Sequence, residues 1–315
     1  MKRAFTVAAL AALATGPALA QSDVTVYGRV NLTVESQDAN GVKTKVMNDN
    51  SSRLGFKGSE DLGDGLRAGF QLEHGFSADT GQPATAFWGR QSEVNLSGKF
   101  GMVRLGNFRS EAYYAIAESV SLHNHDTGTS ADDLYAELGS KTNKVAWRLP
   151  EFAKGLSIEA AVTAGEGVPG AVHTYDVAVD YNAGPMHVGF GYQKGGSSTV
   201  SATQYAISGL YRMGEFIFGG YWQRDENAFG PGTRDNFRGS VAYITGPHEF
   251  HLNGGKASEY SNLANSGAAQ MTAAYNYNLS KRTKLYGYYT QVNAEAATPY
   301  LKDFSSLALG MRHNF

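Results

Sequence analysis

The chain has 315 residues, no cysteine, and nearly balanced charge, with 27 basic against 29 acidic side chains. The missing cysteine excludes disulfides, thiol chemistry and cysteine-bound metals, and the weak negative charge offers no general attraction to nucleic acid or anionic lipid. Glycine, tyrosine and phenylalanine are abundant at 38, 18 and 16 residues, but no stretch after the N-terminal run approaches the ~20 apolar residues of a membrane helix.

The N-terminal segment has the pattern of an export signal. Lys2 and Arg3 give a positive start, residues 4–13 are apolar, and small residues occupy positions 18 and 20. The alternative, a membrane anchor, needs a longer run and a stop signal after it. We therefore predict a cleaved signal peptide over 1–20 and one domain over 21–315.

Beyond this segment, apolar and polar side chains alternate with a period of two. In residues 23–35 every second residue from Val24 to Val34 is apolar or glycine, and the residues between them are mostly polar. Successive side chains of a strand point to opposite faces, so this pattern predicts a strand with one apolar and one polar face. Similar alternation recurs over 66–73, 156–163, 174–181, 186–192, 205–211, 216–222, 237–243, 271–277 and 307–311.

The segments between these strands alternate in length. Short turns rich in Gly, Pro, Asn and Asp lie at 61–65, 98–101, 182–185, 213–215, 245–248 and 278–281. Longer polar loops are expected near 36–50, 78–86, 107–139, 166–172, 195–201, 225–234, 258–267 and 295–303. Eight long loops with short turns between them imply about sixteen strands, and transmembrane barrels place their short turns on the periplasmic side.

The fold class we predict is all-β, a transmembrane antiparallel up-and-down barrel. A soluble sandwich or solenoid would also alternate, but every connection here suits a simple meander. Aromatic residues also fall at strand ends, where a membrane barrel has its aromatic girdle. Such a barrel must be closed, because open strand edges are not tolerated in lipid.

Five short motifs, in their order and spacing, resemble the general diffusion porins of Gram-negative outer membranes. They lie at 24–29, 52–58, 89–91, 103–108 and 310–315. The resemblance implies an outer-membrane homotrimer of sixteen-stranded barrels with an inserted third loop. It also implies a water-filled channel for passive diffusion of ions and small hydrophilic solutes, with no catalysis and no cofactor. Contacts with outer-membrane lipid and lipopolysaccharide, and recognition of Phe315 by barrel-assembly machinery, are further implications.

In that family, basic residues on the strands face acidic residues of the third loop across a constriction. Here Arg29, Arg53 and Arg90 match the basic positions of strands one, two and four, and the alternation also puts Arg29 and Arg53 on the polar face. Lys144 and Arg148 are expected to extend this basic wall.

The acidic partner is expected in the longest loop, residues 107–139. The family's Pro-Glu-Phe-Gly-Gly type motif is absent there, and residues 121–126 stand in its place. Glu118 is the first candidate for the constricting acid, and Asp126 is the second.

The strand expected near 89–98 does not separate its faces cleanly. Arg90 shares a face with Val94 and Leu96, whereas Glu93 and Asn95 share the opposite face. Polar groups against lipid are costly. We therefore expect this part of the wall to face a neighbouring subunit, with Val94 and Leu96 packed under the inserted loop.

Four other functions remain to be weighed. His123, His125 and Asp126 could bind zinc or nickel, but a solvated loop is the default expectation, so no metal site is predicted. No His and Ser occur in a recognisable nucleophile turn, which disfavours an enzyme. A substrate-specific channel would need aromatic or anion-binding residues in the lumen. The expected lumen residues are small and give it little support: Ala178, Gly189, Gly191 and Ala206.

A barrel used for adhesion, with a plugged lumen, is the last alternative. It differs from a diffusion channel in passing no current.

Overall fold

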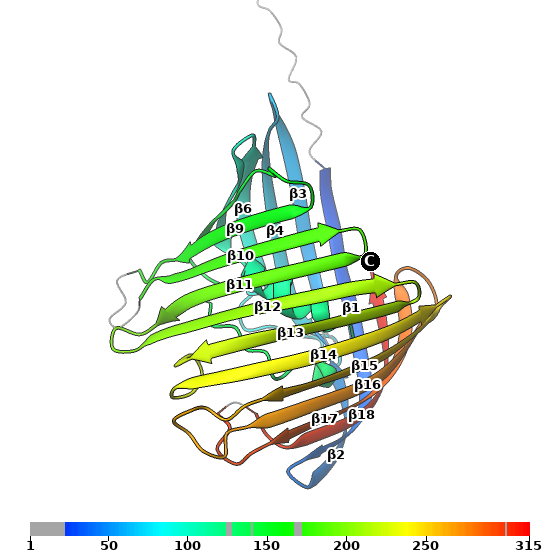
Figure 1. The fold of residues 1–315 in the computed structure, drawn as a ribbon. Helices are drawn as coiled ribbons and strands as arrows, with labels where there is room; N and C mark the ends of the chain where they lie inside the picture. Colours follow the sequence, from blue (N-terminus) through cyan, green and yellow to red (C-terminus); the bar gives the residue numbers. More distant parts are fainter. Residues whose placement is uncertain (1–22, 124–127, 140, 167–171, 300) are drawn as a thin grey trace, which may run out of the picture.

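The structure, a computed structural model, describes residues 23–123, 128–139, 141–166, 172–299 and 301–315. Within these residues, sixteen strands form one closed antiparallel wall (Figure 1). They are β1 (Asp23–Ala39), β3 (Arg53–Gly63), β4 (Leu66–Ser77), β6 (Gln91–Gly98), β7 (Gly101–Asn107), β8 (Lys144–Arg148), β9 (Leu156–Thr163), β10 (Thr174–Ala183), β11 (Met186–Gly196), β12 (Ser201–Met213), β13 (Phe216–Glu226), β14 (Thr233–Thr245), β15 (His248–Ala257), β16 (Ala268–Asn278), β17 (Thr283–Ala294) and β18 (Phe304–Asn314). The predicted all-β, sixteen-stranded barrel is confirmed.

The barrel closes where its last strand pairs with its first. Arg29 of β1 lies opposite Asn314 of β18, and Ala39 lies opposite Phe304. Beyond the last strand, Gly28 and Phe315 exchange two backbone hydrogen bonds of 3.0 and 3.1 Å. A Cβ at Gly28 would lie 2.3 Å from the Phe315 ring, so glycine there lets the terminal ring pack on the seam.

Two further strands extend the wall without adding to its circumference. β2 (Val42–Asp49) pairs with the C-terminal half of β1. The two strands are joined by the turn at Asn40 and Gly41, whose φ angles are 51° and 83°. Asn-Gly is the favoured pair for a two-residue hairpin turn. The expected long loop over 36–50 is therefore wrong. The second extra strand, β5 (Gln82–Pro83), pairs with the end of β4.

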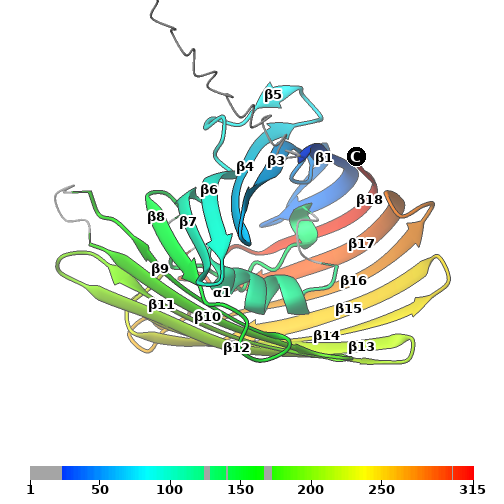
Figure 2. The ribbon, with the colours of Figure 1, turned by 90° about the horizontal axis from the view of Figure 1, so that it is seen from above.

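The two faces of the wall differ as the alternation predicts. Large apolar side chains are exposed on the outer face, such as Val24 at 60 %, Phe237 at 57 % and Leu309 at 72 %. Polar side chains on the inner face are buried, among them Asn31 and Gln223. The third loop, which includes helix α1 (Glu111–Tyr113), lies inside the ring of strands (Figure 2). Side chains on the inner face are therefore shielded from solvent by this loop.

The polarity of β6 differs from the prediction. Val94 and Leu96 are 54 % and 39 % exposed on the outer face, whereas Glu93 is buried on the inner face against Arg104. The strand begins at Gln91. Arg90 precedes it, so the alternation of the strand does not determine which face the Arg90 side chain takes. The expected packing of Val94 and Leu96 under the loop is therefore wrong, and the subunit contact inferred from it loses its basis.

In the part of the chain that the structure describes, helical structure is confined to short turns of the third loop. No helix among the described residues has the length and apolarity needed to cross a membrane.

Candidate constriction site

The described parts of the third loop, residues 108–123, 128–139 and 141–143, form an outward and a return limb along the inner wall. It contains α1, the π-helical turn η1 (Tyr114–Glu118) and the 3-10 turn η2 (Gly128–Ser130). The Ser110 hydroxyl caps the first turn by accepting a hydrogen bond of 3.1 Å from the backbone NH of Ala112, which satisfies one orphan donor of the helix end. The same hydroxyl donates to Asp176 of β10 at 2.9 Å, so the cap also fixes the loop to the wall.

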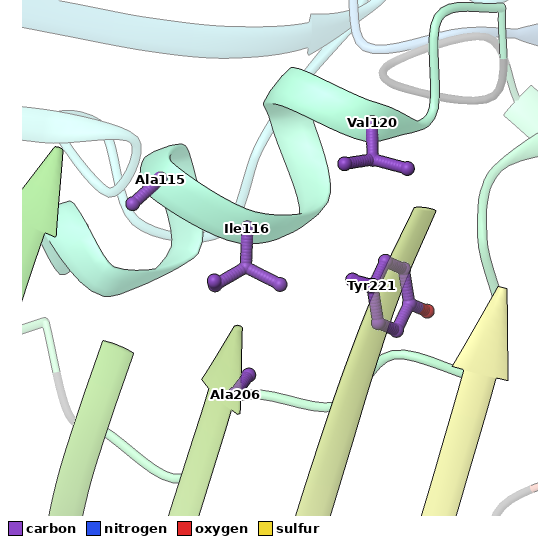
Figure 3. Packing of buried hydrophobic residues seen from close by; sticks show 5 residues of the cluster. All are labelled: Ala115, Ile116, Val120, Ala206 and Tyr221. Atoms are coloured by element: carbon purple, nitrogen blue, oxygen red, sulfur yellow. The ribbon is translucent and has the colours of Figure 1, made fainter. Parts of the chain in front are cut away.

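An apolar cluster fixes the helical part of the loop. Ala115, Ile116 and Val120 are fully buried against Ala206 of β12 and Tyr221 of β13 (Figure 3). Burial of such side chains stabilises by roughly 25 cal/mol per Å². The cluster therefore holds one face of η1 against the strands and leaves the other face toward the lumen.

Small residues on the wall make this approach possible. A Cβ at Gly189 would lie 2.2 Å from the carbonyl oxygen of Ala115, and a Cβ at Gly191 would lie 2.8 Å from the Cβ of Ala112. Gly189, Gly191 and Ala206, which the sequence places on the lumen face, thus lie beneath the loop. They say nothing about the surface that a solute meets.

Hydrogen bonds from the inner wall follow the loop in both directions. On the outward limb, Ser208 donates to the carbonyl of Ala115 at 2.7 Å and Ser240 donates to that of Val120 at 2.7 Å. On the return limb, Gln204 and Gln223 both donate to the carbonyl of Ala136, at 2.6 and 2.8 Å. The loop backbone is therefore satisfied by wall side chains, as buried polar groups require.

An ionic network holds the start of the loop. The Arg104 guanidinium, only 7 % exposed, contacts Glu93 at 2.7 Å, Glu111 at 2.7 Å and Glu159 at 3.2 Å. Arg148 contacts Glu111 and Glu159 at 2.7 and 2.9 Å. Glu111 is the loop member of the network. Removing one partner of such a buried group costs about 3–5 kcal/mol, because a charge is left uncompensated.

A second buried group of contacts, centred on Asp132 and called the pin below, holds the return limb. Asp132 accepts from Arg238 at 2.8 Å and from the Tyr221 hydroxyl at 2.5 Å. Burial and the Asp132 charge beside it raise the pKa of Asp133 to about 6, against a smaller opposing effect of Arg238.

The far end of the loop is bound to the strands near the seam. Thr129 donates to Glu35 of β1 at 2.8 Å and lies 2.8 Å from the Tyr288 hydroxyl of β17. Glu35 is 1 % exposed and also accepts from Tyr288 at 3.0 Å and from Ser306 at 2.7 Å. The loop is thus fixed at its start, its return limb and its far end.

The wall across the lumen from η1 carries the basic residues predicted from the sequence. Arg53 and Arg90 both contact Glu73 of β4, at 3.8 and 2.6 Å. Arg29 lies opposite Arg53 in the strand register and donates to Asn314 at 3.2 Å. Three arginines and one carboxylate therefore lie together on this part of the inner wall.

Glu118, the first candidate for the acidic partner, is half-buried at the end of η1. It interacts electrostatically with Tyr114, which also interacts with Arg109 of the loop and Glu73 of the wall. Glu118 stays the predicted acidic partner of the basic wall.

The remaining predicted residues are placed differently. Lys144 is on the inner face but 1 % exposed, where it contacts Asp176 at 3.2 Å and the Phe108 ring at 5.6 Å. Arg148, predicted beside it, is 33 % exposed. Asp126 lies outside the described residues.

The expected solvated surroundings of His123 are not observed. The side chain is 4 % exposed against His251, Tyr286 and Tyr288. Burial, together with the charges of His251 and nearby cations, lowers the pKa of His123 to about 3. His125 lies outside the described residues, and within those residues no three metal-ligating side chains gather.

Several residues that shape the site are not predicted as such from the sequence. Glu73 alternates with apolar neighbours and could have been predicted as a lumen residue. The pairing of Arg109 with Glu137, at 2.9 Å, joins two loop limbs whose paths no periodicity encodes.

Comparison with known proteins supports one family. The family model described as "Gram-negative porin" matches residues 6–297. "Outer membrane porin protein 32" of Delftia acidovorans is 32 % identical over 314 residues, covering 89 % of this chain and 86 % of that protein.

Solved structures agree on the fold. The "Anion-selective porin from Comamonas acidovorans" has a TM-score of 0.75 at 24 % identity, covering 93 % of this chain and 100 % of the other. The OmpF of Salmonella typhi, solved in complex with daunomycin, has a TM-score of 0.76 at 12 % identity, covering 93 % and 97 %. The chain thus belongs to the Gram-negative porins and is an outer-membrane porin that forms a channel for passive diffusion.

Proposed function

We propose that this porin is a non-catalytic homotrimer whose channel is narrowed between the third loop and the wall of β1, β3 and β4. Arg29, Arg53 and Arg90 form the basic side of the constriction, and Glu118 forms the acidic side. Charges placed on opposite sides of a narrow pore act on ions at close range. Small hydrophilic solutes then pass according to size and charge, with no energy source.

We further propose a preference for anions. The observation that carries it is the sharing of Glu73 by Arg53 and Arg90, at 3.8 and 2.6 Å, which leaves the basic side with a net positive charge. The solved relative that is described as anion-selective supports the same sign. Lys144 is left out of the constriction because Asp176 pairs with it beneath the surface.

The trimer is supported by an aliphatic band on the outer face that includes β1 and β6, two strands that β3 and β4 separate in the wall. Val24 and Val26 of β1 and Val94 and Leu96 of β6 are all exposed. We expect this band to contact the neighbouring subunits. We expect the strands that carry aromatic side chains on their outer face to contact lipid, including lipopolysaccharide. Residues 1–20 remain a proposed signal peptide, and Phe315 a proposed signal for barrel assembly.

The reversal potential under a salt gradient tests the constriction. Arg53→Ala with Arg90→Ala should shift it toward cations. Lys281→Ala with Arg282→Ala is the matched control, because it removes two positive charges from an exposed turn between β16 and β17. An equal shift in both double variants, or none in the first, would refute the assignment.

A further inference from the structure

A cavity of about 270 Å³ lies between the two limbs of the third loop. Its lining includes Tyr113 and Ser121 of the outward limb and Tyr135 and Glu137 of the return limb, together with Arg109 and with Ser51 between β2 and β3. Its volume is close to the lower end of small-molecule pockets, which is about 300 Å³. The lining contains two aromatic rings and several hydrogen-bonding groups, a combination typical of a ligand site.

The aromatic side of the cavity is held rigidly. The Tyr113 and Tyr135 rings meet edge to face, with centroids 5.7 Å apart. Tyr135 in turn meets Tyr221 of β13 at 5.7 Å, also edge to face. The hydrogen bond from Tyr221 to Asp132 fixes this ring to the loop pin. The rings are therefore positioned before any ligand arrives.

The polar side is an arginine and a carboxylate at hydrogen-bond distance. Nε of Arg109 donates to Glu137 at 2.9 Å, and the guanidinium lies 3.7 Å from the centre of the Tyr113 ring. This bond uses Nε, so the Nη groups can donate to a ligand, and the Arg109 side chain is 32 % exposed. A fork of N–H donors beside carboxylate oxygens matches adjacent hydroxyl groups, which both donate and accept.

The charge of the lining favours a neutral ligand. Arg109 is balanced by Glu137, and Asp132, which also lines the cavity, is balanced by Arg238 at 2.8 Å behind it. An anion would gain no net attraction here, unlike at the arginines of the opposite wall. The ligand should therefore carry hydroxyl groups but no charge.

We propose that this cavity is a binding subsite for a neutral sugar of monosaccharide size. C–H groups of the sugar contact Tyr113 and Tyr135, and its hydroxyl groups bond to Arg109 and Glu137. The inference rests on the proposed open channel, through which the sugar reaches the loop. Three of the four small residues that disfavoured a substrate-specific channel, Gly189, Gly191 and Ala206, lie beneath the loop, so they do not count against it.

Saturation-transfer NMR of D-glucose with folded protein in detergent micelles tests the subsite. It reports binding whether or not the protein conducts, and a titration gives the half-saturating concentration. Tyr113→Leu keeps apolar volume but removes the ring, and should raise that concentration at least fivefold. Ala131→Leu should do the same by filling the cavity, since Ala131 is part of its lining. Tyr175→Leu is the matched control, because this ring is exposed on β10 and does not line the cavity, and should change it less than twofold.

Single-channel recording of the same proteins separates this inference from the proposed function. Glucose should reduce wild-type KCl current saturably, with the same half-saturating concentration as the NMR titration. Normal KCl current with no saturable glucose binding would overturn the subsite alone. Absent KCl current would refute the channel, and the NMR titration would still decide the subsite. Stronger binding of gluconate than of glucose, or equal loss in the Tyr113 and Tyr175 variants, would also overturn it.

Discussion

Gly189→Ala should detach the helical part of the third loop from the wall. The new Cβ would lie 2.2 Å from the carbonyl oxygen of Ala115 and 2.6 Å from the Ser208 hydroxyl. The loop backbone must then move by about 1 Å to restore ordinary van der Waals separation. The move also strains the bond from Ser208, and the contact of His187 at 3.1 Å, to the same carbonyl. Overpacking and weakened hydrogen bonds together should cost about 2–4 kcal/mol.

Because the wall is rigid, the loop should move into the lumen and lower the single-channel conductance. Thermal unfolding followed by circular dichroism should show the lower stability. Gly209→Ala is the matched control, since a Cβ there meets nothing within 4 Å. The control should conduct normally and gain a few tenths of a kcal/mol, because alanine suits a strand better than glycine. Unchanged conductance and stability in Gly189→Ala would refute the close packing of loop and wall.

Two further predictions concern the pin of the return limb. Asp132→Asn leaves the Arg238 charge buried without its partner and should lower the free energy of unfolding by about 3–5 kcal/mol. The loosened loop should raise open-channel current noise. Current noise equal to that of the wild type would contradict the role of the pin. Asp133→Asn should stabilise the protein at pH 7.5 but not at pH 4, measured by thermal unfolding. The Asp133 pKa is raised from 3.8 to about 6, so the wild type loses stability as pH rises through this window, by at most about 3 kcal/mol. A gain that is equal at both pH values would contradict the assigned protonation.

The barrel could be predicted from the sequence because its determinants are local. In β1 the alternation from Val24 to Val34 fixes the faces, and the short turns fix the order of strands. The prediction failed where a local signal was missed. Asn40-Gly41 is a hairpin turn inside an expected loop, and Arg90 precedes the strand that the alternation predicts for it, because that strand begins at Gln91.

The constriction could be predicted only in part. Arg29 and Arg53 follow from the same alternation as the strands. The path of the third loop does not, because it depends on contacts between residues far apart in the sequence, such as Asp132 with Arg238 and Ser110 with Asp176. For the same reason Lys144 was placed on the correct face, while its ion pair beneath the loop was not foreseen.

The central claim is an open trimeric pore with a basic constriction, and recording the purified protein in a planar bilayer under a tenfold salt gradient tests it most directly. We predict stepwise conductance with closures in thirds and a reversal potential on the anion side. Silence from protein that is shown to be folded would mean a plugged lumen and would contradict the account.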